Sequence, residues 1–363
     1  MNRITGLYHH LNALRKQKAI RLSYFRLYEK IFSRHPELNK ARYNEIEWLK
    51  RWKEYDSSVS VASYRIFADF IGEDLNIIPL EVCANLVEPK LNPSEYIGFY
   101  GDKNSLNLFI PDEYMPHIIL RDINGHCLDQ HYGNVENITE TLASYNCDKL
   151  ILKPSLECSG QGVQLITKKD NIYINQTGEP VSEEYLSKCY RENYLIQECI
   201  EQSNYMSQFN PTSVNTIRIF TYRDINGNIH PMRSVLRIGG KGANVDNAHS
   251  GGMFCGITED GKLGSYCCSW LGDTTHTFNG INFRESDWAI PNFEAVKQFS
   301  VNIAKRIPHH DLVALDIALD KHDNPKLIEI NVGGFSAWLF QFTIGSTFDI
   351  FTNEIMNRCK IAQ

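Results

Sequence analysis

The 363-residue chain lacks several features that would assign a protein to a class at once. It has no excess of one charge: 37 basic and 43 acidic residues leave a net charge of −6, which argues against nucleic acid as a partner. No apolar run approaches the roughly 20 residues of a membrane-spanning helix, and the first residues lack the apolar core of a signal peptide. Neither repeats nor low-complexity segments are present. We therefore expect a cytoplasmic protein with no transmembrane segment.

The ten cysteines also lack an ordered pattern. They form no C-x-x-C pair, and only Cys267 and Cys268 are adjacent. This pattern indicates reduced thiols and excludes a disulfide framework or a zinc site. The hydrophobic share of 42% and the charged share of 22% are ordinary for a globular protein. Because a single core stops growing at roughly 250–300 residues, two or three lobes are expected.

Helical periodicity dominates the first part of the chain. Apolar residues at three- and four-residue steps predict helices between residues 7 and about 70. Arg21, Arg26 and Lys30 lie between these apolar positions and are compatible with a helix that contacts a membrane surface or a partner. We favour the alternative, an amphipathic helix on the protein surface. Three prolines between residues 79 and 93 then predict broken structure.

Short strands and turns replace the helical pattern from Asp148 onward. Strands are predicted in LIL before Lys153, and in GVQLI, NIYIN, YLIQECI and TIRIFTY. Hairpins are predicted at residues 216–239 and 312–331, and a helix with one apolar face follows Pro291. Helices and mainly antiparallel hairpins in separate blocks predict an α+β protein.

The second of these hairpins, LVALDIALD followed by PKLIEIN, carries two acidic residues of interest. Alternate residues of a strand share a face, so Glu329 and Asn331 are expected to share one with Leu327. A tight turn would set Asp316 directly opposite Glu329, and like charges so placed destabilise a hairpin unless a cation lies between them. Two carboxylates and an amide oxygen are ligands that Mg²⁺ prefers. The alternative is a solvated face with scattered acids, against which the small alanines beside Asp316 argue.

A glycine-containing loop lies in the segment LILKPSLECSGQGVQLI. Ser159, Gly160, Gln161 and Gly162 would let backbone N–H groups approach a polyphosphate, and Lys153 would add a positive charge nearby. The loop matches neither the P-loop nor a dinucleotide-binding motif. In isolation, a plain hairpin connection is the better interpretation.

The strand YLIQECI ends with residues suited to hold a purine ring. A strand edge at Gln197 and Glu198 would offer backbone groups to an adenine, and Ile200 would cover the ring. The alternative is an ordinary buried strand that leaves the core.

Three arginines follow in the first predicted hairpin. Arg233 and Arg237 are four residues apart and are expected to share a strand face, with Arg218 on the preceding strand. Guanidinium groups suit a phosphate or an acyl phosphate, although a surface ladder of ion pairs is an equal alternative. The next loop, GGKGANVDNAHSGG, has five glycines and is typical of a substrate or phosphate loop. Its polar candidates are Asp246, Asn247 and His249.

Taken in order, these segments resemble the ATP-grasp superfamily from about Lys103 to about Gly334. SVNTIRIFTY, LRIGGKGANVDNAHSGG and LIEINVGG are most similar to the sugar-transfer-associated ATP-grasp family. LIQECI, TIR and EIN also look like the glutamate ligases that modify a ribosomal protein. The resemblance implies an ATP-grasp fold, in which two α+β subdomains clasp ATP, with ATP and Mg²⁺ as cofactors.

The resemblance also implies a division of the chain. Residues 1–95 would form a mainly helical region of unknown role, and residues 96–363 the ATP-grasp domain. Within that domain, residues 146–200 would be a lid-like ATP-binding subdomain, and residues 201–363 would hold the metal and the substrate.

The residue roles that the resemblance implies fall into four groups. Residues on the nucleotide would be Lys103, Lys153, Ser159, Gly160, Gln161, Gly162, Gln197, Glu198, Cys199, Ile200 and Thr216. The catalytic residues would be Arg218, Arg237 and Lys153. The substrate residues would be Arg233, Asp246, Asn247 and His249. The Mg²⁺ ligands would be Asp316, Glu329 and Asn331.

The implied activity is that of an ATP-dependent carboxylate–amine ligase that forms an acyl phosphate. The family name suggests cell-surface polysaccharide biosynthesis, with a sugar acid or glycan as the carboxylate and an amino acid as the amine. A sugar or small-molecule kinase is one alternative, and a non-catalytic nucleotide-binding partner of a glycosyltransferase is another. The sequence NVGGFSAW replaces the Pro-Gly turn that often follows the asparagine, and Glu157 and Cys158 lie in the flap. Both departures fall where the acceptor should approach.

Overall fold

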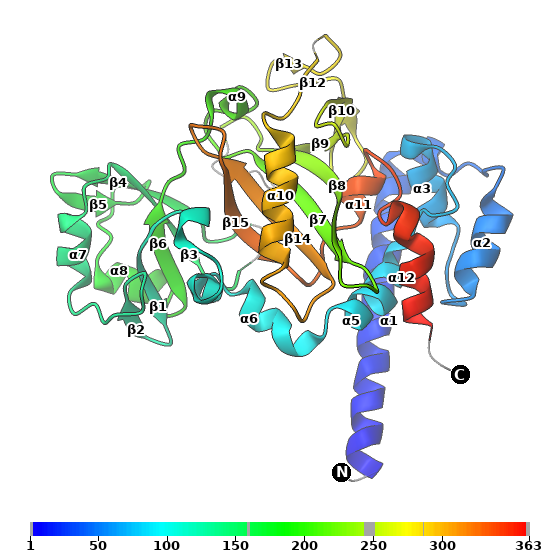
Figure 1. Cartoon of the computed structure of the whole chain (residues 1–363), viewed down its shortest axis with the longest axis horizontal. Coiled ribbons are helices and arrows are strands. Elements are labelled where there is room, and N and C mark those ends of the chain that lie inside the picture. The colour runs from blue at the N-terminus through cyan, green and yellow to red at the C-terminus, as the bar shows by residue number, and fades with distance from the viewer. Residues whose placement is uncertain (1–2, 158–159, 243–250, 286, 361–363) are drawn as a thin grey trace.

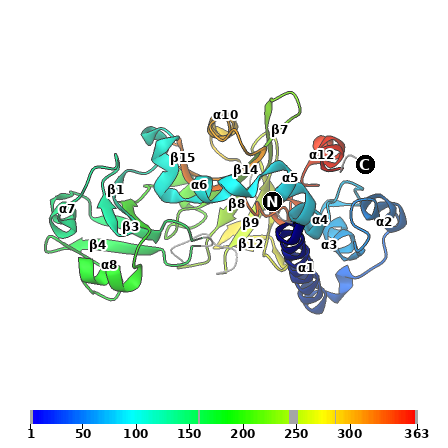
Figure 2. The same cartoon turned by 90° about the horizontal axis from the view of Figure 1, so that it is seen from below.

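The computed structural model describes residues 3–157, 160–242, 251–285 and 287–360, and for residues 3–10 it describes the backbone alone. Three parts follow one another along the long axis of the molecule: a small lobe, a central seven-stranded sheet and a helical end (Figures 1 and 2). The helical end contains both the first and the last helices of the chain. The protein is α+β, as predicted.

The small lobe is built on a six-stranded antiparallel sheet in the order β2-β1-β6-β3-β4-β5. Its elements are Ile118–Ile123 (β1), His126–Leu128 (β2), Ile138–Ser144 (α7), Lys149–Pro154 (β3), Gln164–Lys169 (β4), Ile172–Ile174 (β5), Glu183–Cys189 (α8) and Tyr194–Glu198 (β6). Alternate strand residues such as Leu150, Leu152 and Ile196 are fully buried against apolar residues of α7 and α8. The lobe thus has a core of its own.

The central sheet is also antiparallel throughout, in the order β11-β10-β9-β8-β7-β14-β15. Its strands are Thr216–Arg223 (β7), Ile229–Ile238 (β8), Met253–Ile257 (β9), Leu263–Cys268 (β10), Thr274–Thr275 (β11), Leu312–Leu319 (β14) and Pro325–Asn331 (β15). A short helix, Asn204–Ser207 (α9), precedes the sheet, and a two-stranded ribbon joins Thr277–Phe278 (β12) to Ile281–Asn282 (β13). Both long predicted hairpins, β7–β8 and β14–β15, are therefore confirmed.

The two faces of the central sheet are covered differently. Helix α10 (Phe293–Ala304) packs on one face through its predicted apolar stripe, in a core shared with Ile219. The opposite face presents Phe220 to the helical end. Because alternate residues share a face, Arg218 and Asp316 lie on the side that faces the helical end. The helices cover only part of that face, and charged side chains line the rest.

The helical end combines N-terminal and C-terminal segments in one core. Its helices are Arg3–Arg34 (α1), Pro36–Leu38 (η1), Glu45–Lys53 (α2), Ala62–Ile71 (α3), Leu80–Val82 (α4), the π-helix Cys83–Val87 (η2), Glu88–Leu91 (α5), Trp338–Gln341 (α11), Asp349–Phe351 (η7) and Thr352–Cys359 (α12). The N-terminal half of α1 extends away from the body (Figure 1). Short helices lead from this end to the small lobe: Ser94–Tyr96 (η3), Ile97–Gly101 (α6), Lys103–Leu108 (η4) and Asp112–Tyr114 (η5).

Several strands are absent from the sequence-based prediction. β1 and β2 precede residue 148, where the first strand was expected, and β9 to β11 were not predicted. These strands are short, β9 and β10 contain glycine and cysteine, and β11 has only two residues, so they carry little alternation of polar and apolar residues. The nine described cysteines have free thiols, as expected. None of the helices in the described ranges is long and apolar enough to cross a bilayer.

Candidate active site

The charged centre of the large sheet contains two carboxylates on neighbouring strands. Asp316 of β14 lies directly opposite Glu329 of β15, and Ala314 lies opposite Asn331. The predicted register is therefore confirmed. Asp316 is buried, whereas Glu329 and Asn331 are half-buried. The three residues predicted to bind Mg²⁺ therefore belong to two nearby cross-strand pairs of one hairpin.

The path of β15 differs from simple alternation. A β-bulge follows the Asp316–Glu329 pair, because Leu327, and not Ile328, is the next paired residue of β15. An extra residue shifts the alternation by one position. Leu327 and Ile330 therefore both pack in the core beneath α10, and the expectation that Leu327 shares a face with Glu329 is wrong. The bulge anchors β15 in the core and keeps its polar residues on the other face.

Two arginines hold the buried carboxylate of Asp316. Arg218, directly opposite it on β7, donates from Nε to Oδ1 and from Nη2 to Oδ2, the latter at 2.8 Å. Arg237 of β8 donates from Nη1 to Oδ2 at 2.7 Å. Burial alone would raise the pKa of Asp316, but the charges of Arg218 and Arg237 outweigh it and hold the pKa well below its usual range. The carboxylate is therefore ionised, and it orients both guanidinium groups.

A lysine from the segment that leads into the small lobe holds the second carboxylate. Lys103 Nζ lies 2.9 Å from Glu329 Oε1 and donates to the carbonyl of Glu157 at 3.0 Å. Asp102 caps the short helix η4 by accepting from the backbone N–H of Asn104. The Lys103 N–H bonds to the carbonyl of Ser155 at 3.1 Å. Lys103 thus connects the start of the glycine loop to β15.

A second lysine approaches from β3. Lys153 is only 7% exposed, and within the described ranges its ammonium has no hydrogen-bond partner. Burial, and then the positive charge of Lys103, lower the pKa of Lys153 to about 7, while Glu329 acts in the opposite direction. A buried lysine with a lowered pKa is ready to accept an anion that restores its charge.

The site as a whole has an excess of positive charge. The four cations are Lys103, Lys153, Arg218 and Arg237, set against two carboxylates on β14 and β15. With Lys153 protonated, the excess is two positive charges on a partly buried surface. Such a surface attracts a ligand with several negative charges.

The last strand of the small lobe, β6, leads toward this charged centre. Gln197 is buried opposite Ile151 of β3. Glu198 accepts a hydrogen bond from the Tyr145 hydroxyl, and its backbone N–H donates to His117 at 2.9 Å. The ring of Tyr145 stacks on that of His117, with centroids 5.9 Å apart. The end of β6 is therefore a fixed edge of the lobe.

The chain crosses to the large sheet immediately after β6. Cys199 and Ile200 are half-buried in the crossing segment, and burial raises the pKa of the Cys199 thiol to about 11. Ser203 then joins the large sheet through a bond from its N–H to the carbonyl of Leu319, at 3.0 Å. Thr216, at the start of β7, is buried directly opposite Arg237. This crossing segment thus lies between the lobes, close to the charged centre.

The sequence matches the family described as sugar-transfer-associated ATP-grasp over residues 86–356. The chain belongs to this family. The ATP-grasp fold predicted from the sequence is thereby confirmed. No curated protein matches the chain.

Solved structures with a remotely similar fold include several ATP-grasp proteins. One is N5-carboxyaminoimidazole ribonucleotide synthetase from Thermotoga maritima, with 11% identity, a TM-score of 0.40, and coverage of 73% of this chain and 52% of the other. Another is the D-alanine–D-alanine ligase from Coxiella burnetii, with 9% identity, a TM-score of 0.39, and coverage of 72% and 58%. A third is the ATP-grasp ligase PsnB complexed with minimal precursor, with 11% identity, a TM-score of 0.39, and coverage of 73% of this chain and 62% of the other. This ATP-grasp chain thus spans about half to three-fifths of each of them.

The glycine loop of the ATP-grasp domain is described from Gly160 onward, and Ser159 lies outside the described residues. Gly162 has φ +71°, and a Cβ there would lie 2.9 Å from Pro154 Cγ. Its carbonyl accepts from the Tyr190 hydroxyl at 2.6 Å. Glycine is therefore required at this position, whereas Gln161 is exposed.

The predicted substrate residues of the ATP-grasp domain are not all brought together. Asp246, Asn247 and His249 lie outside the described residues. Arg233 and Arg237 contact different partners. The Nη2 of Arg233 lies 3.1 Å from Asp349 Oδ2, and its Nε donates to the Ser346 carbonyl. Arg233 lies within an irregularity of the β7–β8 register, between the paired residues Pro231 and Ser234. Arg233 is thus held by the C-terminal segment, and Arg237 by Asp316.

Two further polar residues of this ATP-grasp chain were not identified from the sequence. Tyr145 fixes the carboxylate of Glu198, as described above. Glu88 of α5 accepts from the backbone N–H of Gly334 at 2.7 Å, in the loop that follows Asn331, and burial raises its pKa to about 7. Glu88 and Gly334 are 246 residues apart in sequence, so no local spacing signals their contact.

Proposed function

We propose that this protein is an ATP-dependent ligase that activates a carboxylate as an acyl phosphate and joins it to an amine. One observation carries the proposal: two lysines from the small-lobe side and two arginines from the large sheet converge on the opposed pair Asp316 and Glu329. This combination of four cations with two carboxylates suits a triphosphate and its metal ion.

The nucleotide is proposed to lie between the small lobe and the large sheet. Lys103 and Lys153 would bind the α- and β-phosphates, since both ammonium groups face Glu329. The glycine loop would cover the phosphates with its backbone N–H groups. The edge of β6 from Gln197 to Ile200 would hold the adenine at the crossing segment. In this proposal, residues 146–200 act as the lid and residues 201–363 carry the metal and substrate site.

The residues on β14 and β15 fit a magnesium ion. Asn331 Nδ2 is buried and has no hydrogen-bond partner in the described part of the chain, so its amide is not committed to another contact. Among the described residues, no group of three or more His, Cys, Asp or Glu side chains is placed to hold a metal ion by itself. Mg²⁺ in nucleotide sites usually takes one or two carboxylates and completes its shell with phosphates and water. Asp316, Glu329 and Asn331 would hold the ion, which would neutralise charge on the transferring phosphoryl group.

The arginines would serve the reacting groups. Arg218 and Arg237 are held in place by the carboxylate of Asp316, so their orientation is fixed before substrate arrives. A carboxylate that attacks the γ-phosphate brings further negative charge to the site, and paired guanidinium groups lower the cost of that approach. The same groups would stabilise the oxyanion formed when the amine attacks the acyl phosphate.

A substrate screen tests the proposal. Mg-ATP is incubated with the full chain and with pairs of uronic-acid sugars and amino acids, and ADP release is followed by mass analysis of the product. We expect ADP, inorganic phosphate and an amide, in keeping with a cytoplasmic step of polysaccharide biosynthesis. A phosphorylated sugar with no free phosphate would contradict the ligase assignment and indicate a kinase.

A further inference from the structure

The first helix, α1, packs on the body of the protein over only part of its length. Its C-terminal half joins the core of the helical end through Tyr28 and Ile31. Arg21 pairs with Asp56 at 2.7 Å where this packed half begins. The N-terminal half extends away from the body (Figure 1), and from residue 11 to residue 19 every residue except Asn12 is exposed. The expectation of an amphipathic helix on the protein surface therefore describes the packed half alone.

The extended half carries leucines that the described part of the protein leaves uncovered. Leu11, Leu14 and Leu22 are between 43% and 47% exposed. Because residues three and eleven positions apart lie on the same side of a helix, these leucines form a row. The row covers about 16 Å of helix, at roughly 1.5 Å per residue. Single apolar residues on a surface are normal, but an aligned row marks a contact surface.

Basic residues are interleaved with this leucine row. Arg15 and Lys18 are four and seven residues after Leu11, so they lie on the same side of α1. Both are exposed, and within the described ranges neither forms an ion pair. The whole helix has eight basic residues and one acidic residue, in a chain whose net charge is −6. The rest of the chain is therefore strongly acidic, and an anionic surface would attract α1 while repelling the body.

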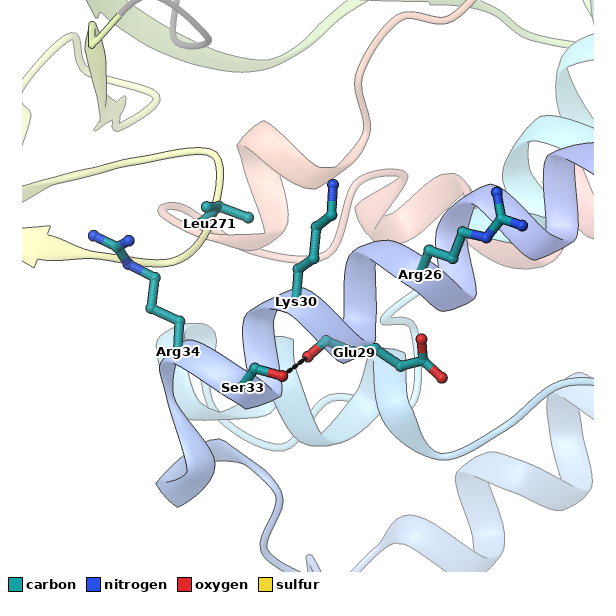
Figure 3. Close-up of a pocket in the computed structure, with 6 residues that line it drawn as sticks. All are labelled: Arg26, Glu29, Lys30, Ser33, Arg34 and Leu271. Atoms are coloured by element: carbon teal, nitrogen blue, oxygen red, sulfur yellow. Dashed lines mark hydrogen bonds between the residues drawn. The ribbon is translucent and has the colours of Figure 1, made fainter.

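The basic side of α1 continues to the point where the helix meets the body. Arg26 is four residues after Leu22, and Lys30 follows four residues later. Both line an open hollow of about 710 Å³ beside Leu271. Figure 3 shows the two cations on the side of α1 that faces Leu271, with the Glu29 carboxylate extending in a different direction. Glu29, the acidic residue of the helix, lies seven residues beyond Leu22 and thus outside the leucine row.

A second copy of the chain fits this surface poorly. Two α1 helices paired through their leucine rows would bring Arg15 and Lys18 of one copy close to the same residues of the other. Like charges at a helix interface oppose pairing, and no acidic residue of the row offsets them. Charge complementarity therefore favours an anionic partner that also accepts leucine side chains.

We infer that residues 11–26 of α1 dock on the surface of a membrane that contains anionic lipids. The leucines would enter the boundary between the headgroups and the acyl chains, and the cations would pair with lipid phosphates. Because Arg15 and Lys18 alternate with the leucines, the helix would lie along the surface. The inference does not depend on the proposed ligase chemistry, since no residue of α1 belongs to the charged centre.

The test is co-sedimentation of the full chain, without nucleotide, with two kinds of vesicle. One is phosphatidylcholine with roughly one-third phosphatidylglycerol, an anionic lipid, and the other is phosphatidylcholine alone. We expect binding to the mixed vesicles that weakens at high salt, and little binding to the neutral ones.

Matched variants assign the binding to α1. R15Q/K18Q should weaken binding to the mixed vesicles by about tenfold or more, because each basic residue near an anionic surface contributes about fivefold. K169Q/K188Q removes two exposed cations from the small lobe and should bind like the parent protein. L11Q/L14Q keeps every charge and should also bind several-fold more weakly. Circular dichroism and thermal unfolding show whether each variant is folded, and glutamine is compatible with a helix.

Several outcomes would overturn the inference. The parent protein could fail to bind the mixed vesicles, or bind neutral ones as tightly. Equal weakening by K169Q/K188Q, or unchanged binding by folded R15Q/K18Q, would show that α1 is not the docking surface. Unchanged binding by L11Q/L14Q would indicate attraction to any polyanion without insertion. A dimer in sedimentation velocity that L11Q/L14Q abolishes would assign the leucine row to a second copy. The ligase assay contains no vesicles, so ADP release and membrane binding can each fail without the other.

Discussion

Glu329→Gln removes one negative charge from the centre of the site and keeps the size of the side chain. Glu329 pairs with Lys103 at 2.9 Å, with side chains only 19% and 9% exposed, and it also faces Lys153. The chain offers a matched control in Glu201→Gln. Glu201 pairs with Lys321 at the same 2.9 Å, but these side chains are 73% and 60% exposed.

The burial of each pair determines the expected size of the effect. Removing one partner of a buried pair costs about 3–5 kcal/mol, and we expect about 2–3 kcal/mol for Glu329→Gln, because Lys153 can lose its proton and relieve part of the cost. Glu201→Gln should have no measurable effect on stability, since its pair is exposed to solvent. Denaturant unfolding of the two variants beside the parent protein measures the difference.

Activity provides the second readout. Loss of a metal contact on the transferring phosphate should lower kcat by about 10³-fold or more, while Mg-ATP still binds, more weakly, through the adenine site. ADP release and calorimetric titration with Mg-ATP separate the two effects. If Glu329→Gln matches Glu201→Gln both in stability and in turnover, the assignment of the charged centre is wrong.

Three further substitutions test single parts of the site. Arg218→Ala should lower kcat by about 10²–10³-fold, measured by steady-state kinetics. It should weaken Mg-ATP binding, measured by calorimetry, less than Lys153→Ala does. A greater loss of Mg-ATP affinity in Arg218→Ala than in Lys153→Ala would contradict the assigned roles. Lys153→Met should raise the Tm more at pH 6 than at pH 9. The pKa of Lys153 is about 7 in the folded protein, below the 10.5 of a solvent-exposed lysine, so the cost of burying its charge is complete below pH 7 and decreases as the pH rises from 7 to 10.5. An equal Tm change at both pH values would refute this. Gly162→Ala should raise the Kd for Mg-ATP several-fold, because a Cβ at φ +71° would lie 2.9 Å from Pro154; an unchanged Kd would exclude a role for the loop backbone.

Local patterns in the sequence predicted the central hairpin well. Alternation along β14 and the short turn to β15 fix the Asp316–Glu329 register, because both depend on residues within one hairpin. The apolar stripe of α10 was identified for the same reason. The bulge beside Leu327 was not predicted, since its position depends on packing beneath α10 and not on alternation.

Contacts between segments far apart in the sequence could not be predicted from local sequence patterns. Lys103 was named from a resemblance, but its pairing with Glu329 joins residues more than 200 positions apart. For Arg233, local spacing gave a prediction that a distant contact overrides. The spacing predicted that Arg233 lies beside Arg237, but Arg233 forms an ion pair with Asp349 of the C-terminal segment.

The fate of one oxygen atom tests the acyl-phosphate route most directly. With a carboxylate substrate identified in the screen and labelled with ¹⁸O in its carboxyl group, attack on the γ-phosphate transfers one labelled oxygen to the phosphoryl group. The account predicts that the inorganic phosphate released on amide formation carries ¹⁸O, measured by mass spectrometry. Unlabelled phosphate from a confirmed substrate pair, or label recovered in AMP, would contradict it.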